Sequence, residues 1–240
     1  MELQRKLVVE FIGTFFFVFA IGEALTNAGR FAPLAIGAAL MVMVFAGGHI
    51  SGGHFNPAVS TAAAVRGKLP SNELIPYFVA QGAGALVAAL IFLGVEEDAA
   101  TFEFAGAGTM LVVEFLFTFA LCWVVLHTAT SAATEGNSFY GLAIGFTVLA
   151  GVYAVGALSG GAFNPAVAFG AMIMGFFAWS DIWIYLIANF LGGAAAAIAF
   201  LYVNPAEEPE PREAETAPPR DRRRRREAEP PPPRDWGPEP

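Results

Sequence analysis

The chain has 240 residues, of which 56% are apolar and only 14% are charged, against about 25% charged in ordinary soluble domains. Residues 205–240 alone contain 8 of the 13 Lys and Arg and 10 of the 21 Asp and Glu, so the preceding body holds very little charge. Such a body cannot cover a water-facing surface, which argues against a soluble enzyme, a nucleic-acid binder or a disulfide-stabilised secreted domain.

Six apolar stretches are long enough to cross a hydrocarbon core of about 30 Å, which needs about 20 helical residues. They extend roughly over residues 7–25, 34–50, 73–95, 107–129, 139–158 and 181–203. Two further apolar pieces, 57–65 and 165–174, would cover only about half the membrane as helices, so protein or a water-filled cavity must surround their backbone. The sequence therefore predicts an all-α membrane protein with six transmembrane helices and two re-entrant half-helices.

The distribution of charge predicts how the chain is oriented. Basic residues lie before the first span, before the third and after the sixth, whereas the opposite side holds mainly acids: Arg5, Lys6, Arg66, Lys68 and the Arg cluster, against Glu96, Glu97, Asp98 and Glu103, with Arg30 as the exception. Positive residues favour the cytoplasmic side, so both termini are expected there. Residues 204–240, rich in Pro, Glu and Arg, are expected to form a disordered tail outside a channel domain of residues 1–203; the tail either contacts anionic lipid or is a solvated spacer.

The body contains an internal repeat. A shift of 108 residues aligns SGGHFNPAV at 51–59 with SGGAFNPAV at 159–167, and a shift of 104 aligns VVEF at 8–11 with the same letters at 112–115. The repeats cover about residues 7–95 and 107–203. Because each contains three spans, the second must enter the membrane from the opposite side, so the repeats are inverted and the two half-helices meet near the midplane.

Each half-helix begins with Asn-Pro-Ala. The residues are Asn56, Pro57 and Ala58 in the first half and Asn164, Pro165 and Ala166 in the second. Proline suits the first helical position, and the preceding Asn caps the helix with its side-chain oxygen, which leaves its amide as a donor toward the pore. With about half a positive charge at each helix N-terminus, cations are repelled while neutral hydrogen-bonding solutes pass. One such motif is an ordinary helix start; two in register within apolar repeats predict a pore.

These motifs resemble the aquaporin family of water and small-solute channels over residues 5–203. The resemblance is carried by HISGGHFNPAV at 49–59 and GGAFNPA at 160–166. It implies one pore per subunit, a homotetramer in the lipid bilayer, and a pore loop to which Gly53, His54 and Gly160 contribute. No cofactor is implied. The histidines and Cys122 show no metal-ligand spacing, so no metal is expected either.

The chain departs from the family pattern at the outer selectivity filter. Most members have an arginine after the second Asn-Pro-Ala, whereas this chain has Val167. Spacing from the two motifs places the other filter positions at Ile36, Val152 and Gly161, so the predicted filter has no charged or donating side chain. Some plant vacuolar-membrane aquaporins, associated with ammonia, urea and peroxide as well as water, are similar here. A wider, apolar filter favours small neutral solutes with weak selectivity.

Glu10 and Glu114 are ionisable groups inside predicted spans. Their equivalent places in the two halves favour structural support, in which each carboxylate accepts backbone N–H groups of the loop before a half-helix. The resemblance implies the same support, and a proton relay is the alternative. We therefore expect a passive channel that excludes ions and protons and is not an enzyme; the alternatives are a proton-coupled transporter that uses Glu10 and Glu114, or a structural membrane protein with a closed pore.

Overall fold

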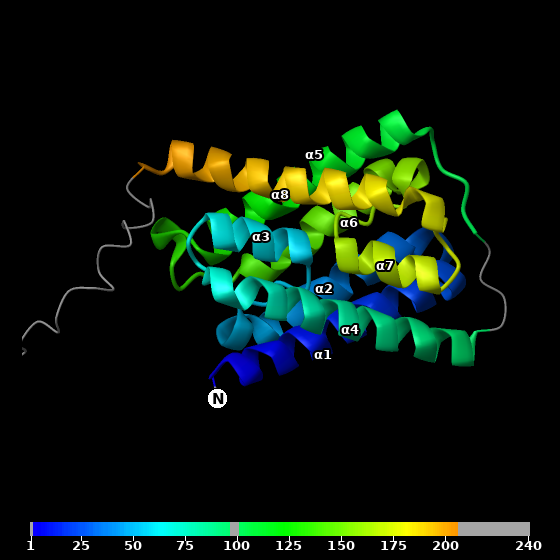
Figure 1. The fold of residues 1–240 in the computed structure, drawn as a ribbon, viewed down its shortest axis with the longest axis horizontal. Coiled ribbons are helices and arrows are strands. Elements are labelled where there is room, and N and C mark those ends of the chain that lie inside the picture. The colour runs from blue at the N-terminus through cyan, green and yellow to red at the C-terminus, as the bar shows by residue number, and fades with distance from the viewer. Residues whose placement is uncertain (1, 97–100, 206–240) are drawn as a thin grey trace, which may run out of the picture. The chain divides into compact units, whose positions relative to one another are not determined.

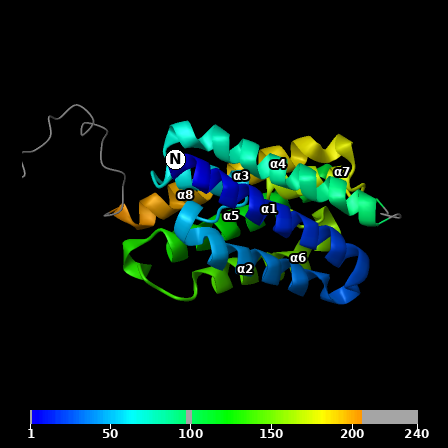
Figure 2. The same ribbon diagram turned by 90° about the horizontal axis from the view of Figure 1, so that it is seen from below.

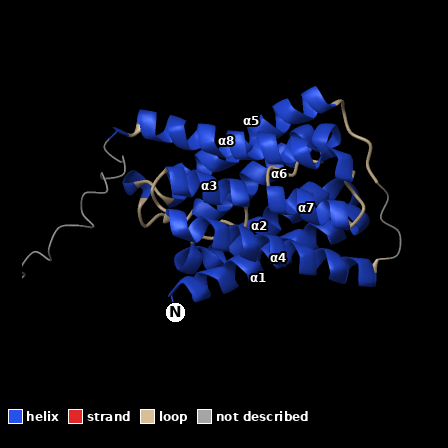
Figure 3. Ribbon diagram, in the orientation of Figure 1, coloured by secondary structure: helices blue, strands red, loops and turns tan. Residues whose placement is uncertain are grey.

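The computed structural model describes residues 2–96 and 101–205. Within these ranges the chain consists of helices and loops, with no strand (Figure 3). The α-helices are α1 Glu2–Asn27, α2 Ala32–Ser51, α3 Pro57–Val65, α4 Ser71–Val95, α5 Ala107–Ala129, α6 Tyr140–Ser159, α7 Pro165–Ile173 and α8 Ile182–Val203. Short 3-10 turns, Gly29–Phe31, Ala132–Thr134 and Trp179–Asp181, precede α2, follow α5 and precede α8.

Six of these helices are long and apolar enough to cross a membrane, and they coincide with the six predicted spans. Most boundaries agree within about two residues. The exception is α1, which begins at Glu2 rather than near residue 7, because the predicted span counted only its apolar part. The half-helices α3 and α7 have nine residues each. The predicted all-α fold with six spans and two half-helices is therefore confirmed.

The packing of the helices repeats between the halves. Helix α1 packs on α4 and α2, and in the same way α5 packs on α8 and α6 (Figures 1 and 2). The half-helices are exchanged, since α3 packs on α8 of the second half while α7 packs on α4 of the first. Figure 1 shows α3 and α7 between these two pairs of long helices, and the two also contact each other. The exchange joins the inverted halves into one unit with a continuous apolar core.

Helices α2 and α6 cross very closely, at equivalent glycines of the repeat. A Cβ atom on Gly37 would lie 2.7 Å from the carbonyl oxygen of Gly145, and a Cβ on Gly145 would lie 2.5 Å from that of Gly37. Any larger side chain would therefore push the backbones apart. Small residues at such crossings let membrane helices approach closely, and here the crossing joins the two halves.

A left-handed glycine ends each helix that leads into a half-helix. Gly52 after α2 has φ 91° and Gly160 after α6 has φ 85°, and the N–H of each donates to the carbonyl four residues earlier. Glycine adopts this conformation without steric cost, so the chain can turn sharply back into the protein. The turn directs residues 53–56 and 161–164 toward the centre of the unit.

The predicted disordered tail comprises residues 204–240, of which 206–240 lie outside the described residues. The acidic loop between α4 and α5 is described only in part, because residues 97–100 also lie outside them.

Candidate pore

Each Asn-Pro-Ala motif begins a half-helix with a side-chain cap. Asn56 has an extended backbone, and its Oδ1 accepts hydrogen bonds from the N–H of Ala58 at 2.8 Å and of Val59 at 3.5 Å. Asn164 caps α7 in the same way, with Ala166 N at 2.9 Å from its Oδ1. The prolines occupy the first helical position in both. These contacts are the ones expected for an Asn before a helix-starting Pro.

The amide groups of the two asparagines cross between the halves. Asn56 Nδ2 donates to the carbonyl of Phe163 at 2.9 Å, and Asn164 Nδ2 donates to the carbonyl of Phe55 at 2.9 Å. Both asparagines are almost completely buried. Since a side-chain amide has two N–H donors, each asparagine retains one for the cavity. The sequence predicted the donors but not this crossed arrangement.

Phe55 and Phe163 have an unusual backbone. Both have φ 48°, a left-handed conformation that bulky residues rarely adopt. Their N–H groups donate to Glu10 and Glu114, and their carbonyls accept the asparagine amides. Contacts on both sides of the residue thus hold a conformation that would otherwise cost of order 1–3 kcal/mol. Strain of this kind requires support from surrounding structure, which the carboxylates provide.

Each buried carboxylate accepts four hydrogen bonds. Glu114 accepts from Ser159 Oγ at 2.8 Å and Asn189 Nδ2 at 2.9 Å, and also from two backbone N–H groups, those of Ala162 at 3.0 Å and Phe163 at 2.8 Å. Such contacts offset much of the cost of burying a charge.

Glu10 repeats this pattern in the first half. Its partners are Ser51 Oγ at 2.7 Å, Gln81 Nε2 at 2.8 Å and the backbone N–H groups of His54 at 2.9 Å and Phe55 at 2.7 Å. Both glutamates are fully buried. The contacts with the loop N–H groups are those that the support hypothesis requires.

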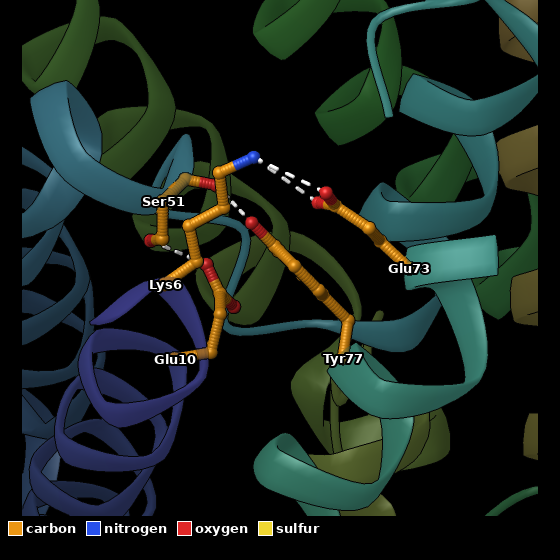
Figure 4. A network of polar contacts seen from close by, with 5 residues as sticks. All are labelled: Lys6, Glu10, Ser51, Glu73 and Tyr77. Atoms are coloured by element: carbon orange, nitrogen blue, oxygen red, sulfur yellow. Dashed lines mark hydrogen bonds and ion pairs between the residues drawn. The ribbon is translucent and has the colours of Figure 1, made fainter. Parts of the chain in front are cut away.

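Figure 4 shows how the first network continues toward the surface. Tyr77 donates its hydroxyl to the Ser51 carbonyl at 2.8 Å, while the hydroxyl of Ser51 donates to Glu10. Tyr185 donates to the Ser159 carbonyl at 2.7 Å in the second half. Lys6 and Glu73 form an ion pair at 3.1 Å between α1 and α4. Because both partners of that pair remain partly exposed, it contributes little stability compared with the buried network.

Two spaces that share lining residues lie along the candidate path. A vestibule of about 650 Å³ is lined by loop and helix-end residues that include Lys6, Lys68, Glu135 and Tyr140. A narrower cavity of about 10 Å³, roughly the room that one water needs, is lined by Gly53, Asn56 and Asn164 among others.

His54 and Val125 line both spaces.

The four predicted filter residues are placed as follows. Val152 on α6 and Gly161 are neighbours, since a Cβ on Gly161 would lie 3.3 Å from Val152 Cγ2. Ile36 on α2 and Val167 on α7 are each 4% exposed and belong to the apolar core. Their convergence with the first pair on one constriction stays a prediction. Gly160 lies beside the rings of Phe177 and Phe104, which cover it.

Sequence reasoning missed Gln81 and Asn189, the side-chain amides that donate to Glu10 and Glu114. The shift of 108 residues aligns them, so the repeat contained a signal for them. Phe55 and Phe163 were visible only as part of the motif. Within residues 2–96 and 101–205, no three His, Cys, Asp or Glu side chains lie close enough together to hold a metal ion.

Two half-helices that meet at a narrow cavity, inside six apolar helices of an inverted repeat, define an integral membrane protein of the channel class. Residues 1–200 match the model of the major intrinsic protein family. The chain is 37% identical to aquaporin NIP1-1 of Zea mays, over 85% of this chain and 77% of that protein. It is 38% identical to nodulin-26 of Glycine max, over 85% and 80% of the two chains.

A probable TIP-type alpha aquaporin of Phaseolus vulgaris is 35% identical over 88% of this chain and 89% of its own length. The aquaglyceroporin of Plasmodium falciparum has the same fold, with a TM-score of 0.75 and 21% identity over 85% of this chain and 98% of that one. The chain thus belongs to the major intrinsic protein family, the aquaporins, which are channels for water or small solutes rather than enzymes.

Proposed function

We propose that this protein is a passive channel for water, for small neutral solutes (ammonia, urea, molecules of the size of glycerol, or gases), or for both, and that it excludes ions and protons. The crossed asparagine pair at the narrow cavity is the observation that supports this most directly. Each asparagine has one free N–H, and each half-helix N-terminus adds partial positive charge, so a passing water turns its oxygen toward the centre. A cation, including hydronium, meets repulsion there.

The proposed filter consists of Ile36, Val152, Gly161 and Val167. The contact between Val152 and Gly161 supports it, as does the absence of any charged or donating side chain among the four. An apolar filter offers no hydrogen bonds to replace hydration, which favours weakly hydrated solutes such as ammonia. Water passes if the filter is wide enough.

We also propose a homotetramer with both termini in the cytoplasm, on the basis of the family and of the charge distribution. Lys6 and Lys68 line the same vestibule, which supports placing these two basic segments on one side of the membrane.

Stopped-flow measurements on proteoliposomes test the channel directly. Purified protein should increase the flux of water and of at least one of ammonia, urea and glycerol above that of empty vesicles. A protein that is folded by size-exclusion chromatography but gives no flux of any of the four solutes would contradict the proposal and favour a closed-pore structural role.

A proton-coupled transporter that uses Glu10 and Glu114 is the second candidate. The four hydrogen bonds accepted by each carboxylate hold it in one place and favour a fixed structural support over a mobile carrier. Solute uptake should therefore be the same with and without an imposed pH gradient. Uptake that follows the gradient and disappears in folded Glu114→Gln protein would establish the transporter instead.

A further inference from the structure

The two glycines that turn the chain toward the half-helices have different surroundings. A Cβ on Gly160 would lie 2.6 Å from Phe177 Cε1 and 3.0 Å from Phe104 Cζ, so two aromatic rings lie against this glycine. The three atoms nearest to a Cβ on Gly52 all belong to His54 of the same loop, and Gly52 is an exposed residue of the vestibule wall. The loop before α7 is therefore covered by aromatic side chains, whereas the loop before α3 faces the vestibule.

The segment 101–105, between α4 and α5, bonds to the chain before and after the covered loop. The N–H of Ala105 donates to the carbonyl of Leu158 at 3.0 Å, close to the end of α6. The N–H of Phe102 donates to the carbonyl of Phe176 at 2.9 Å, beyond the end of α7. Figure 1 shows the segment before α5 and the end of α7 at the same end of the bundle. These bonds hold the segment across the loop of residues 160–164.

Six aromatic rings form a chain at this end of the protein. The chain consists, in order, of Phe92, Phe176, Phe102, Phe104, Phe177 and Tyr185. Neighbouring centroids lie 5.1 to 6.2 Å apart, within the range of stabilising aromatic pairs. Phe104 meets Phe177 edge to face, and Tyr185 stacks on the same ring. Contacts with two neighbours therefore fix the Phe177 ring that lies against Gly160.

The first half does not repeat these rings. The positions equivalent to Phe176 and Phe177, 108 residues earlier, are Lys68 and Leu69. The carboxylate networks and the half-helix caps are nevertheless the same in both halves. Support of a half-helix therefore does not require the aromatic rings, which indicates that they serve something found at one end of the pore only.

Gly161, which follows the covered glycine, is such a feature, because it is a proposed position of the outer filter. A Cβ on Gly161 would lie 3.3 Å from Val152 Cγ2, so its backbone lies beside another proposed filter residue. Because glycine has no side chain, the width of the filter at this position depends on where the backbone itself lies. A wall of this kind is only as well placed as the groups that support it.

We propose that Phe104 is a positioning residue of the outer filter, which acts through Phe177 to hold the backbone of Gly160–Gly161 in place and so limits the size of the solutes that pass. This inference rests on the proposed channel function and on the proposed filter position of Gly161. It adds to the four predicted filter residues a support from outside the repeat motifs.

Three variants separate positioning from general stability. Phe104→Ala removes the ring beside Gly160, whereas Phe104→Met keeps a long, flexible apolar side chain that can fill the same space. Phe102→Ala removes an equal ring from the same chain, but this ring is 40% exposed and pairs with Phe176 and Phe104 rather than with the loop. Flux of water, urea and glycerol is measured by stopped flow in proteoliposomes with equal amounts of folded protein.

Phe104→Ala should raise the urea-to-water and glycerol-to-water flux ratios about threefold, because the loop relaxes into the space that the ring leaves and the filter widens. Phe104→Met should restore both ratios to within about twofold of wild type, since it refills that space. Phe102→Ala should also leave the ratios unchanged, even where its melting temperature falls as far as that of Phe104→Ala. If Phe104→Ala does not fold, Phe104→Val takes its place with the same expected direction.

Hydrogen exchange gives a second measurement, which does not depend on transport. The backbone amides of residues 159–163 should exchange about threefold faster in Phe104→Ala than in wild type, because exchange reports local opening of the loop. Phe104→Met and Phe102→Ala should exchange as the wild type does. Faster exchange with unchanged flux ratios would mean that the ring supports the loop without limiting solute size, which would overturn the inference.

The outcomes distinguish this inference from the proposed function. A wild-type protein without flux would overturn both. If the wild type conducts but the folded Phe104 variants keep its flux ratios and exchange rates, the channel stands and the positioning role of Phe104 is wrong. Equal changes of ratio in Phe104→Ala and Phe102→Ala would mean that the rings only stabilise this end of the protein in general, which also overturns it.

Discussion

At the scale of single residues, polar groups in an apolar interior decide the path. Asn56 and Asn164 use their oxygens as helix caps and one amide proton each to bind the opposite half. Glu10 and Glu114 use their lone pairs to hold the two strained phenylalanines. Few polar atoms in this region are therefore free to bind solute. The orientation of the asparagine amides is fixed by their hydrogen bonds to the opposite half.

Glu10→Gln and Glu114→Gln should each destabilise the protein by about 2 kcal/mol, because an NH2 group then faces a backbone N–H that had a carboxylate partner. Thermal unfolding in detergent measures the effect. Glu103→Gln, at an exposed loop position, is the matched control and should leave the melting temperature unchanged. Equal melting temperatures for all three variants would show that the carboxylates do not support the loops.

Val167→Arg should lower the flux of urea and glycerol about tenfold or more relative to water if residue 167 belongs to the outer filter. A long cationic side chain would both narrow the filter and hold solutes by hydrogen bonds. The comparison is made in proteoliposomes, with Val65→Arg as a control at an exposed position of α3. Unchanged flux ratios in folded Val167→Arg protein would contradict the filter assignment.

At the scale of elements, the crossing of α2 and α6 is one of several close backbone approaches in the bundle. Its cause is the pair Gly37 and Gly145, whose missing side chains let each backbone reach the carbonyl of the other. The sequence predicted both helices within about two residues, because apolar length alone defines a span. It did not predict that these two helices would touch, since hydropathy has no information on neighbours.

Gly145→Leu should destabilise the protein by about 3 kcal/mol or prevent folding, because the new side chain would overlap the Gly37 carbonyl and Met41. Gly82→Leu on α4 is the control, since a Cβ there meets no atom within 4 Å. Yield of monodisperse protein and melting temperature are the measurements. Equal behaviour of the two variants would mean that the crossing is looser than described.

At the scale of the whole molecule, the vestibule lies at one end of the helix bundle and has Lys6 and Lys68 in its lining. The acidic residue Glu103 lies in the segment before α5. Phe102 and Thr101 of this segment bond to Phe176 and Gly175, just beyond the end of α7. From charge alone, the sequence predicted that the basic segments lie on one side of the membrane and the acidic segment before α5 on the other. The topology therefore predicts which introduced residues a reagent reaches from each side.

Membrane-impermeant maleimide should label Glu135→Cys only from the cytoplasmic side and Glu103→Cys only from the opposite side. The chain offers a clean background, because Cys122 is its single cysteine and is fully buried. Labelling is measured in intact cells and in inverted vesicles. Wild-type protein is the control and should stay unlabelled, and the reverse pattern of labelling would overturn the proposed orientation of the termini.

Composition and repetition alone determined much of this protein. Apolar runs define spans because a bilayer core excludes charge, the repeat of three spans implies inversion, and Asn-Pro is a local signal for a capped helix start. These properties depend on residues that are neighbours in the chain, or on the membrane as a solvent, so the sequence contains them.

Only the tertiary structure decided which groups meet. The crossed bonds from Asn56 to Phe163 and from Asn164 to Phe55 join residues more than one hundred positions apart. His54 and Val125 likewise line the same two spaces only because α5 of the second half packs beside the first half. A hydrogen bond depends on distances of a few tenths of an ångström, which follow from the packing of the two halves and not from the pattern of either one.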